Sequence, residues 1–466
     1  MTRSPGWREG RVARARTWLR PGVGIKRWLA VVFLGLLLMA LAGALAIRLA
    51  FRDVPADSPA GELFDLVSLQ MLPDGLRPAT VLIGGLAIFL FGAWRMLGVL
   101  LGPFTARSEP LVELIYQKRS LARGPRVVAI GGGTGLSNLL RGLKEVSSNI
   151  TAVVTVADDG GSSGRLREEL GIPPVGDLRN CIAALADAEP VMARLLQYRF
   201  PAEGPGADGR GHAFGNLLIA ALSDIEGDFP EGVRQSNRVL AVRGQVVPVA
   251  PVALTLHAEL ADGRMLAGQS VISKSRGIRR VWVTPEDVSA SQDALDAIAS
   301  ADLVVFGPGS LYTSLMPSLL VPGMRAALAA TPALRVYVAN VATQLGETEG
   351  YTLGEHLAAL GAHGLGPLID RVVANDKVPA NAPADLLGSP VTIDGPLGGG
   401  SLRVVRADVV NESDAHHHDA PKLTAALMRL HEEHVVQRRP SVVRSCLLYT
   451  SPSPRDRTRS RMPSSA

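Results

Sequence analysis

The chain has 466 residues, of which 47% are hydrophobic and 20% are charged, so it can bury a sizeable core in more than one structural unit. Its two cysteines, Cys181 and Cys446, exclude a disulfide framework and a multi-cysteine metal site, and they favour a reducing compartment. The formal net charge is +5, but the basic residues gather at the two ends, so no nucleic-acid partner is expected.

Two apolar stretches near the N-terminus predict membrane-spanning helices. Residues 28–47 are uncharged and long enough to cross a bilayer, whereas a signal peptide would be shorter and carry a cleavage site. Residues 79–101 are apolar except for Arg95, and a buried helix is the alternative for them. Basic residues dominate before the first stretch and after the second, so we expect a two-pass cell-membrane protein whose main domain is cytoplasmic.

These features divide the chain into a membrane anchor at 1–106, a cytoplasmic domain at 107–440 and a tail at 441–466. The tail is rich in Ser, Pro and Arg and lacks periodicity, so it is either disordered or not native coding sequence.

The middle segment alternates between short apolar, β-branched runs and stretches with helical spacing. The runs at 126–130, 150–157, 301–306, 335–339 and 369–376 predict strands, and the stretches at 136–146, 178–186, 191–200 and 216–225 predict helices. This alternation predicts an α/β fold with a doubly wound, mostly parallel sheet. Residues 246–272 instead alternate by twos around Asp262-Gly263, which predicts an antiparallel β excursion.

Small and polar residues follow four of the predicted strands, at 131–135, 158–164, 307–314 and 340–348. Because ligands of such sheets lie beyond the carboxyl ends of the strands, these loops predict a cleft. No Ser-His-Asp or Cys-His arrangement is legible in them, so no catalytic residue is assigned, and Cys181 lies in an apolar helical pattern typical of a core position.

The first of these loops reads GGGTG and precedes a helix. Glycine lets the backbone approach a diphosphate closely, and the helix turns its free N–H groups and positive dipole end toward the anion. Thr134 can add a hydroxyl. The loop lacks the full dinucleotide fingerprint and the lysine of a P-loop, so a tight turn without a ligand is the alternative.

Asp158 and Asp159 end the second strand. One carboxylate could bind a ribose hydroxyl, the pair could hold Mg²⁺, or both could cap backbone N–H groups in a turn. Ser162 and Ser163 follow among glycines, where hydroxyl groups commonly contact phosphates.

Three histidine features have both a functional and a structural interpretation. His212 and Asn216 lie four residues apart on one face, where Asn216 could instead be an N-cap. The run 416–418 could bind a metal, although adjacent histidines more often form solvated surface. Asp414 or Asp419 is expected to cap the last helix.

Several long motifs together resemble the bacterial YvcK family of gluconeogenesis factors, which is similar in turn to CofD, the 2-phospho-L-lactate transferase. The motifs are VVAIGGGTGLSNLLRGLK, TAVVTVADDGGSSGRLREELGIPPVGDLRNCIAALAD, GHAFGNLLIAAL, LVVFGPGSLYTSLMPSLLVPG and NVATQLGETEGYT. The two predicted spans lie outside the usual family core and resemble a membrane-anchored variant.

The resemblance implies a Rossmann-like fold, homodimers and a UDP-sugar or related nucleotide ligand such as UDP-N-acetylglucosamine, with Mg²⁺ in the CofD case. The positions that match the ligand-binding cleft are Gly131, Gly132, Gly133, Thr134, Gly135, Asp158, Asp159, Asn180, His212, Asn216, Gly307, Gly309, Ser310 and Asn340.

Two functions follow from the resemblance. One is a ligand-sensing regulator of cell shape, peptidoglycan synthesis and carbon metabolism, held at the membrane near peptidoglycan-synthesis proteins. The other is a Mg²⁺-dependent transferase that moves a phospholactyl or phosphoenolpyruvyl group from a guanosine diphosphate donor to a deazaflavin acceptor. The DDGGSSGRLR stretch has the YvcK form, which favours the regulator.

Overall fold

A computed structural model describes residues 118–438 except 188, 201–210, 378–387, 395–396 and 398–401, together with single residues at 33, 36, 37, 40, 73 and 83. The chain divides into two compact units, Met1–Arg119 and Ser120–Ala466. Apart from a few isolated positions, the predicted spans at 28–47 and 79–101 lie outside the described residues. No described helix combines the length and apolar character that a bilayer crossing requires.

The second unit is built on a seven-stranded sheet in the order β10-β9-β8-β7-β1-β2-β3, and all its described pairings are parallel. The strands are β1 (Val127–Gly131), β2 (Ile150–Val154), β3 (Gln245–Pro248), β7 (Leu303–Phe306), β8 (Leu334–Val338), β9 (Arg371–Asn375) and β10 (Arg403–Ala407). β1, β2 and β7 are fully buried, as expected for a parallel sheet covered on both faces. The predicted doubly wound α/β fold is confirmed.

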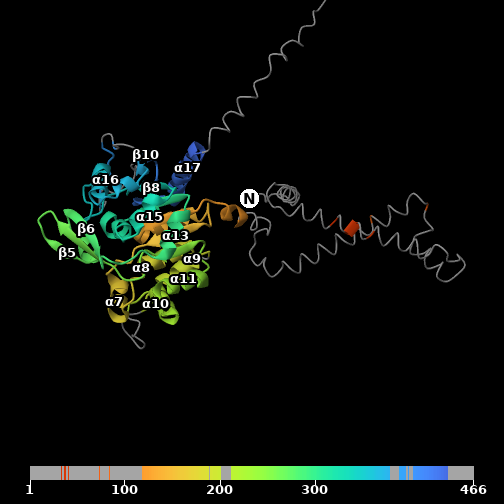
Figure 1. Ribbon diagram of the computed structural model, residues 1–466, viewed down its shortest axis with the longest axis horizontal. Coiled ribbons are helices and arrows are strands. Elements are labelled where there is room, and N and C mark those ends of the chain that lie inside the picture. The colour runs from red at the N-terminus through yellow and green to blue at the C-terminus, as the bar shows by residue number, and fades with distance from the viewer. Residues whose placement is uncertain are drawn as a thin grey trace, which may run out of the picture. The chain divides into compact units, whose positions relative to one another are not determined.

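Helices connect these strands (Figure 1). Those between β1 and β3 are α6 (Gly133–Leu143), α7 (Gly161–Leu170), α8 (Gly176–Leu185), α9 (Glu189–Gln197), α10 (Phe214–Glu226) and α11 (Phe229–Val239). Those that follow are α12 (Gln269–Ile272), α13 (Gln292–Ser300), a π-helical turn (Leu311–Leu315) that continues as α14 (Met316–Leu319), α15 (Met324–Ala330), α16 (Leu353–Ala362), a 3₁₀ turn (Gly366–Leu368) and α17 (Ala420–Arg438).

The order in which the chain adds strands to the sheet reverses between β1 and β7. From β1 it proceeds outward to β2 and β3, and it then returns to the other side of β1 and proceeds through β7, β8, β9 and β10. The sheet therefore has its topological switch point between β1 and β7, and open α/β sheets bind ligands beyond the carboxyl ends of the strands at such a point.

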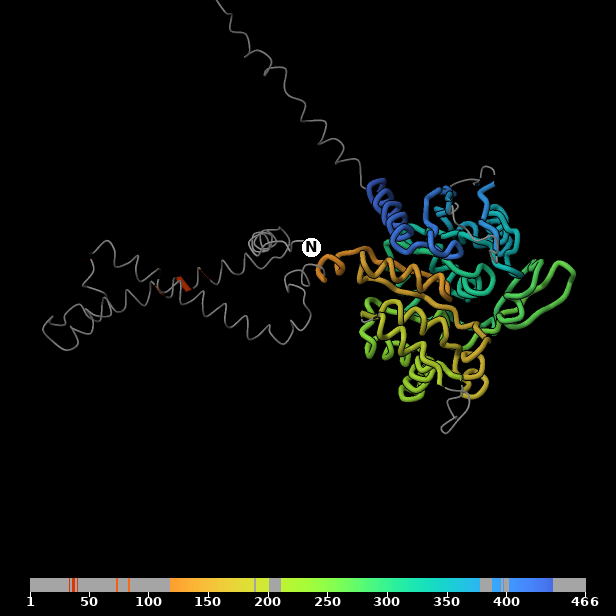
Figure 2. The backbone as a smooth tube through the Cα atoms, turned by 180° about the vertical axis from the view of Figure 1, so that it is seen from behind, coloured from red at the N-terminus to blue at the C-terminus, as the bar shows by residue number. Residues whose placement is uncertain are grey.

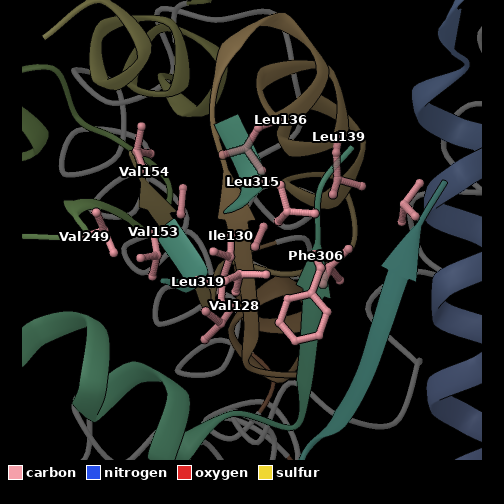
Figure 3. Packing of buried hydrophobic residues seen from close by; sticks show 14 of the residues in the cluster. Val128, Ile130, Leu136, Leu139, Val153, Val154, Val249, Phe306, Leu315 and Leu319 are labelled. Carbon is pink, nitrogen blue, oxygen red and sulfur yellow. The ribbon is translucent and has the colours of Figure 1, made fainter. Parts of the chain in front are cut away.

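The core lies between the sheet and its helices. Leu136 and Leu139 of α6 pack with Ile130 of β1 and Phe306 of β7, and all four are fully buried or nearly so (Figure 3). Helix α6 also packs against α8 and α17, so helices from distant parts of the chain cover the same region. Cys181 belongs to this core, as predicted. The Asp419 carboxylate accepts a hydrogen bond from the Lys422 N–H (2.9 Å), which makes Asp419 the cap of α17.

The predicted antiparallel excursion is present, with one correction. A three-stranded antiparallel sheet, β4 (Thr255–Leu260), β5 (Met265–Ala267) and β6 (Ile278–Thr284), extends from the domain as an arm (Figure 2). Gly263 has a positive φ of 85° at the predicted Asp262-Gly263 turn. Residues 246–248, however, belong to β3 of the parallel sheet, and all three are buried, as expected for a continuous apolar run. A small hairpin, β11 (Val410–Asn411) and β12 (Asp414–His418), precedes α17.

Candidate functional site

A cleft of about 290 Å³ lies beyond the carboxyl ends of β1, β2, β7 and β8, at the point where the chain reverses its direction. The predicted ligand-binding residues that line it are Gly132, Gly133, Thr134, Gly135, Asp158, Gly309, Ser310 and Asn340. The other lining residues include Pro308, Ser314, Val341, Ala342 and Gln344, which lie in the predicted cleft loops 307–314 and 340–348, and His416, His417 and His418, which the sequence offered as a possible metal site. Asn138, Asp177 and Gln269 were not predicted.

The GGGTG loop leads directly into the N-terminus of α6. The N-cap residue Gly132 makes no side-chain cap, and Gly133, Thr134 and Gly135 of the first turn line the cleft. Gly133 has a φ of 67°, a conformation that favours glycine. A Cβ at Gly135 would come within 2.7 Å of the Pro308 carbonyl oxygen, so this glycine lets the β1 and β7 loops pack together. Gly131 is the last residue of β1, and Gly307 directly follows β7.

A buried carboxylate, that of Glu347, holds the loop after β7 in place. Glu347, which is 2% exposed, accepts hydrogen bonds from the Tyr312 N–H (2.6 Å), the Thr313 N–H (3.1 Å) and the Thr313 hydroxyl (2.8 Å). The pKa of Glu347 is raised, because the effect of burial exceeds that of the three hydrogen bonds, which lower it. The carboxylate thus fixes the start of the π-helical turn and with it the GPGS loop that lines the cleft. This contact was not predicted, because its partners lie more than thirty residues apart.

Two carboxylates face the cleft beside the start of α6. Asp158 follows β2, and its Oδ1 accepts a hydrogen bond from the Gly160 N–H (2.9 Å), which is the turn-capping contact considered above. Asp177 lies in the first turn of α8 and accepts a hydrogen bond from the Gly133 N–H. Burial and the neighbouring Asp158 raise the pKa of Asp177 to about 7. Burial also raises the pKa of Asp158.

Asp159 does not line the cleft. Its Oδ1 accepts a hydrogen bond from the Ser270 N–H (2.8 Å), and a Cβ on Gly268 would come within 2.3 Å of its Oδ2. The side chain therefore holds the segment before and within α12, which carries the cleft residue Gln269. The second cleft carboxylate is Asp177, which the sequence places on a different element.

Four predicted site residues form a buried network behind the cleft. Ser162 Oγ lies 3.1 Å from His212 Nδ1 and accepts a hydrogen bond from Asn216 Nδ2 (3.0 Å). Arg179 donates to Asn216 (3.1 Å) and to Asn180 (3.1 Å). Burial and the nearby Arg199 lower the pKa of Arg179, while Asp177 and Asp158 raise it. The network thus holds the buried guanidinium of Arg179 near the two cleft carboxylates, Asp158 and Asp177. Ser163 contributes separately, since it donates to Asp158.

The β11–β12 hairpin brings the histidine run to the other side of the cleft. His418 is buried, lies with its Nε2 3.1 Å from the Ala339 carbonyl oxygen, and accepts at its own carbonyl a hydrogen bond from Asn138. Burial lowers its pKa to about 4, so its imidazole is neutral at physiological pH. His417 pairs with Asp414 (2.7 Å). Among the described residues, no group of three or more His, Cys, Asp or Glu side chains could hold a metal ion.

Mg²⁺ nevertheless fits the carboxylate side of the cleft. This ion usually takes one or two carboxylates together with substrate phosphates and several waters. Asp158 and Asp177 would supply the carboxylates, and the α6 N-terminus beside them is suited to a phosphate. With Asp159 bound to the Ser270 N–H, the pair that fits Mg²⁺ differs from the pair that the sequence suggested.

Comparisons with known proteins agree with the fold and the motifs. Residues 127–410 match the family of 2-phospho-L-lactate transferase CofD. The chain is 47% identical over 374 residues to a relative from Nostoc sp., covering 78% of this chain and 79% of the relative. It is 44% identical over 323 residues to the gluconeogenesis factor of Bacillus subtilis, covering 67% of this chain and 100% of the relative.

A solved structure shares the fold as well. The crystal structure of a Bacillus halodurans protein superimposes with a TM-score of 0.61 at 43% identity, and the match covers 66% of this chain and 100% of that one. Its extent, like that of the Bacillus subtilis match, corresponds to about two thirds of the chain. The chain therefore belongs to the CofD family, within the group of the bacterial gluconeogenesis factors.

Proposed function

We propose that this protein binds a nucleoside diphosphate sugar in the cleft and acts as a ligand-sensing regulator. The observation that carries the proposal is the N-terminus of α6, whose residues Gly133, Thr134 and Gly135 line the cleft, with the Gly133 N–H bonded to the Asp177 carboxylate. The other N–H groups of such a terminus and its positive dipole end attract an anion. The hydroxyls of Thr134, Ser310 and Ser314 line the same space and add neutral donors.

The shape of the cleft supports a ligand that extends on both sides of the diphosphate. The lining loops follow four adjacent strands, β8, β7, β1 and β2, and the α6 N-terminus follows β1 near the middle. Strands of a sheet lie about 4.8 Å apart, so β8 and β2 are separated by roughly 14 Å. A nucleoside on one side of a diphosphate and a sugar on the other fit this arrangement. The regulated processes that we propose are cell shape, peptidoglycan synthesis and carbon metabolism.

We expect the purified full chain to bind UDP-N-acetylglucosamine in isothermal titration calorimetry, and more tightly than it binds inorganic phosphate. The reason is that the diphosphate meets the helix terminus while both flanking groups meet polar side chains. A panel of uridine, guanosine, adenosine and cytidine diphosphates on the same protein identifies the preferred base. Absence of binding to every nucleotide of the panel would contradict the proposal.

The second candidate is the transferase, which the Asp158–Asp177 pair favours because it suits Mg²⁺. When bound, the ion would stabilise charge at a leaving diphosphate. The assay supplies the guanosine diphosphate donor, a deazaflavin acceptor and Mg²⁺, and mass spectrometry detects a transferred phospholactyl or phosphoenolpyruvyl group. Multiple turnover would replace the regulator with the transferase.

We also propose that the two predicted spans hold the domain on the cytoplasmic face of the cell membrane, as a homodimer close to peptidoglycan-synthesis proteins. The support is the flanking charge, because positive residues remain on the cytoplasmic side. A reporter inserted after Gly124 should behave as cytoplasmic, and one inserted near Pro59 as external. Release of the full chain from membranes by high salt alone would contradict the two-span topology.

A further inference from the structure

The lining of the cleft is short of positive charge for a site that takes a diphosphate. It includes the carboxylates of Asp158 and Asp177, and none of its described residues is a lysine or an arginine. The oxygens of a diphosphate carry several negative charges, so they need hydrogen-bond donors beyond those at the N-terminus of α6. The donors that the lining side chains can add are hydroxyls, amides and the imidazoles of β12.

The three histidines of β12 differ in how their rings are engaged. His417 Nδ1 lies 2.7 Å from Asp414 Oδ2, and His418 Nε2 lies 3.1 Å from the Ala339 carbonyl oxygen. His416 is exposed, and although its backbone N–H donates to Asp414 Oδ1 (3.2 Å), its imidazole makes no hydrogen bond to any described residue. Within β12, His416 is therefore the histidine whose ring is free for a ligand.

The alternation of side chains along β12 places the ring of His416 on the cleft side. Successive side chains of a strand point to opposite faces, so His416 shares a face with His418 and not with His417. His418 contacts the carbonyl of Ala339, which leads directly into the cleft-lining residues 340–342. His416 lies two residues further out on the same face, where it is exposed and lines the cleft.

The hairpin is also fastened to the helix whose N-terminus attracts the phosphate. Asn138 of α6 donates its side-chain N–H to the His418 carbonyl oxygen, and β12 packs against α6. Thr134 lies on the same face of α6, one turn nearer its N-terminus. One helical turn and two strand residues cover similar lengths, about 5.4 and 6.6 Å. Outward from the Asn138–His418 contact, Thr134 and His416 therefore reach neighbouring positions in the cleft lining.

We propose that His416 donates a ring N–H to a phosphate oxygen of the ligand and completes, from the β12 side, the anion site that the N-terminus of α6 begins. This inference rests on the proposed nucleotide-sugar binding and assigns one contact within it. Because the contact is to the diphosphate, it contributes to the binding of every ligand that carries one, whatever the base or the sugar.

The test compares His416→Phe with His416→Gln in the full chain. Phenylalanine keeps an aromatic ring without an N–H, whereas glutamine keeps an N–H donor of similar reach without the ring. Calorimetry at one pH and one Mg²⁺ concentration measures binding of UDP-N-acetylglucosamine and of inorganic pyrophosphate, and thermal melting checks that both variants are folded. We expect His416→Phe to weaken both ligands about 10- to 100-fold, because a hydrogen bond to a charged group is lost. His416→Gln should retain most of the affinity of the parent for both.

Two sets of results would overturn the role of His416. If His416→Phe binds as tightly as His416→Gln, or more tightly, the N–H of the ring is not what the ligand requires. If His416→Phe weakens UDP-N-acetylglucosamine but leaves pyrophosphate unchanged, the contact is to the base or the sugar and the assignment to a phosphate is wrong.

Failure of the proposed function gives a different result. If the parent binds pyrophosphate but no nucleotide, nucleotide-sugar binding is refuted, while the comparison of the two variants on pyrophosphate still decides whether His416 contacts a phosphate. If the parent binds neither ligand, both the proposed function and the role of His416 fail.

Discussion

Replacing Asp177 with asparagine should stabilise the protein at pH 8 by up to about 4 kcal/mol and leave its stability at pH 4 nearly unchanged. In the folded state burial and Asp158 raise the pKa of Asp177 to about 7, whereas an aspartate in an unfolded chain titrates near 3.9. Between these values the folded protein holds a proton that the unfolded chain has released. The stability of the parent therefore falls as the pH rises from about 4 to 7, and the loss is complete above the folded pKa.

Asparagine removes this dependence because it does not ionise, while its amide oxygen can still accept the Gly133 N–H. Urea unfolding from pH 4 to pH 8, in EDTA to exclude divalent ions, gives the free energy of unfolding of each protein. Asp224→Asn, at an exposed site in the last turn of α10, is the matched control for the loss of one aspartate charge. Parallel profiles for the parent and Asp177→Asn would show that Asp177 titrates normally.

The expected gain in stability has a functional meaning. Groups whose pKa is shifted by burial and by a like charge are concentrated at binding and catalytic sites. Asp177 occupies an N–H of the glycine loop that an anionic ligand approaches, so its charge opposes the diphosphate unless a proton or Mg²⁺ neutralises it. We therefore expect ligand binding next to Asp177 to be accompanied by the uptake of a proton or of Mg²⁺.

Replacing Thr134 with glutamate should weaken UDP-N-acetylglucosamine binding by at least about 100-fold, or roughly 3 kcal/mol, while the fold is retained. The side chain of Thr134 is exposed in the cleft within the first turn of α6. A carboxylate there occupies the positive end of the helix dipole in place of the phosphate and repels it. The same carboxylate favours the folded helix, because acidic residues in a first turn are stabilising.

Thr134→Gln is the control for size, since it has the shape of glutamate without the charge. It should weaken binding far less than Thr134→Glu in calorimetry, and thermal melting should show both variants folded. This substitution is a cleaner test than a valine at Gly132, where a Cβ would come within 2.3 Å of Asp177 Oδ2 and disturb the protein itself. Equal affinities of Thr134→Glu and the parent would place the diphosphate elsewhere.

Much of the architecture was predictable because it depends on local patterns. The buried strands of a parallel sheet are continuous apolar runs, so β1, β2 and β7 could be located directly from the sequence. Their carboxyl ends meet at one edge, which was enough to predict that the glycine loops after β1 and β7 line one cleft. β3 was misassigned because its short apolar run stands close before the alternating residues of β4, and no local signal marks where the parallel sheet ends.

The sequence by itself determined the doubly wound fold, the family and the glycine loops of the cleft, since these depend on residue type, spacing and chain order. Only the tertiary structure decided which polar side chains face the ligand. Asp159 is adjacent to Asp158 but turns to the Ser270 N–H, while Asp177 reaches the cleft from the start of α8. The histidines of β12 reach the cleft through the hairpin before α17. Side-chain direction depends on partners that are distant in the chain, and no local pattern encodes those partners.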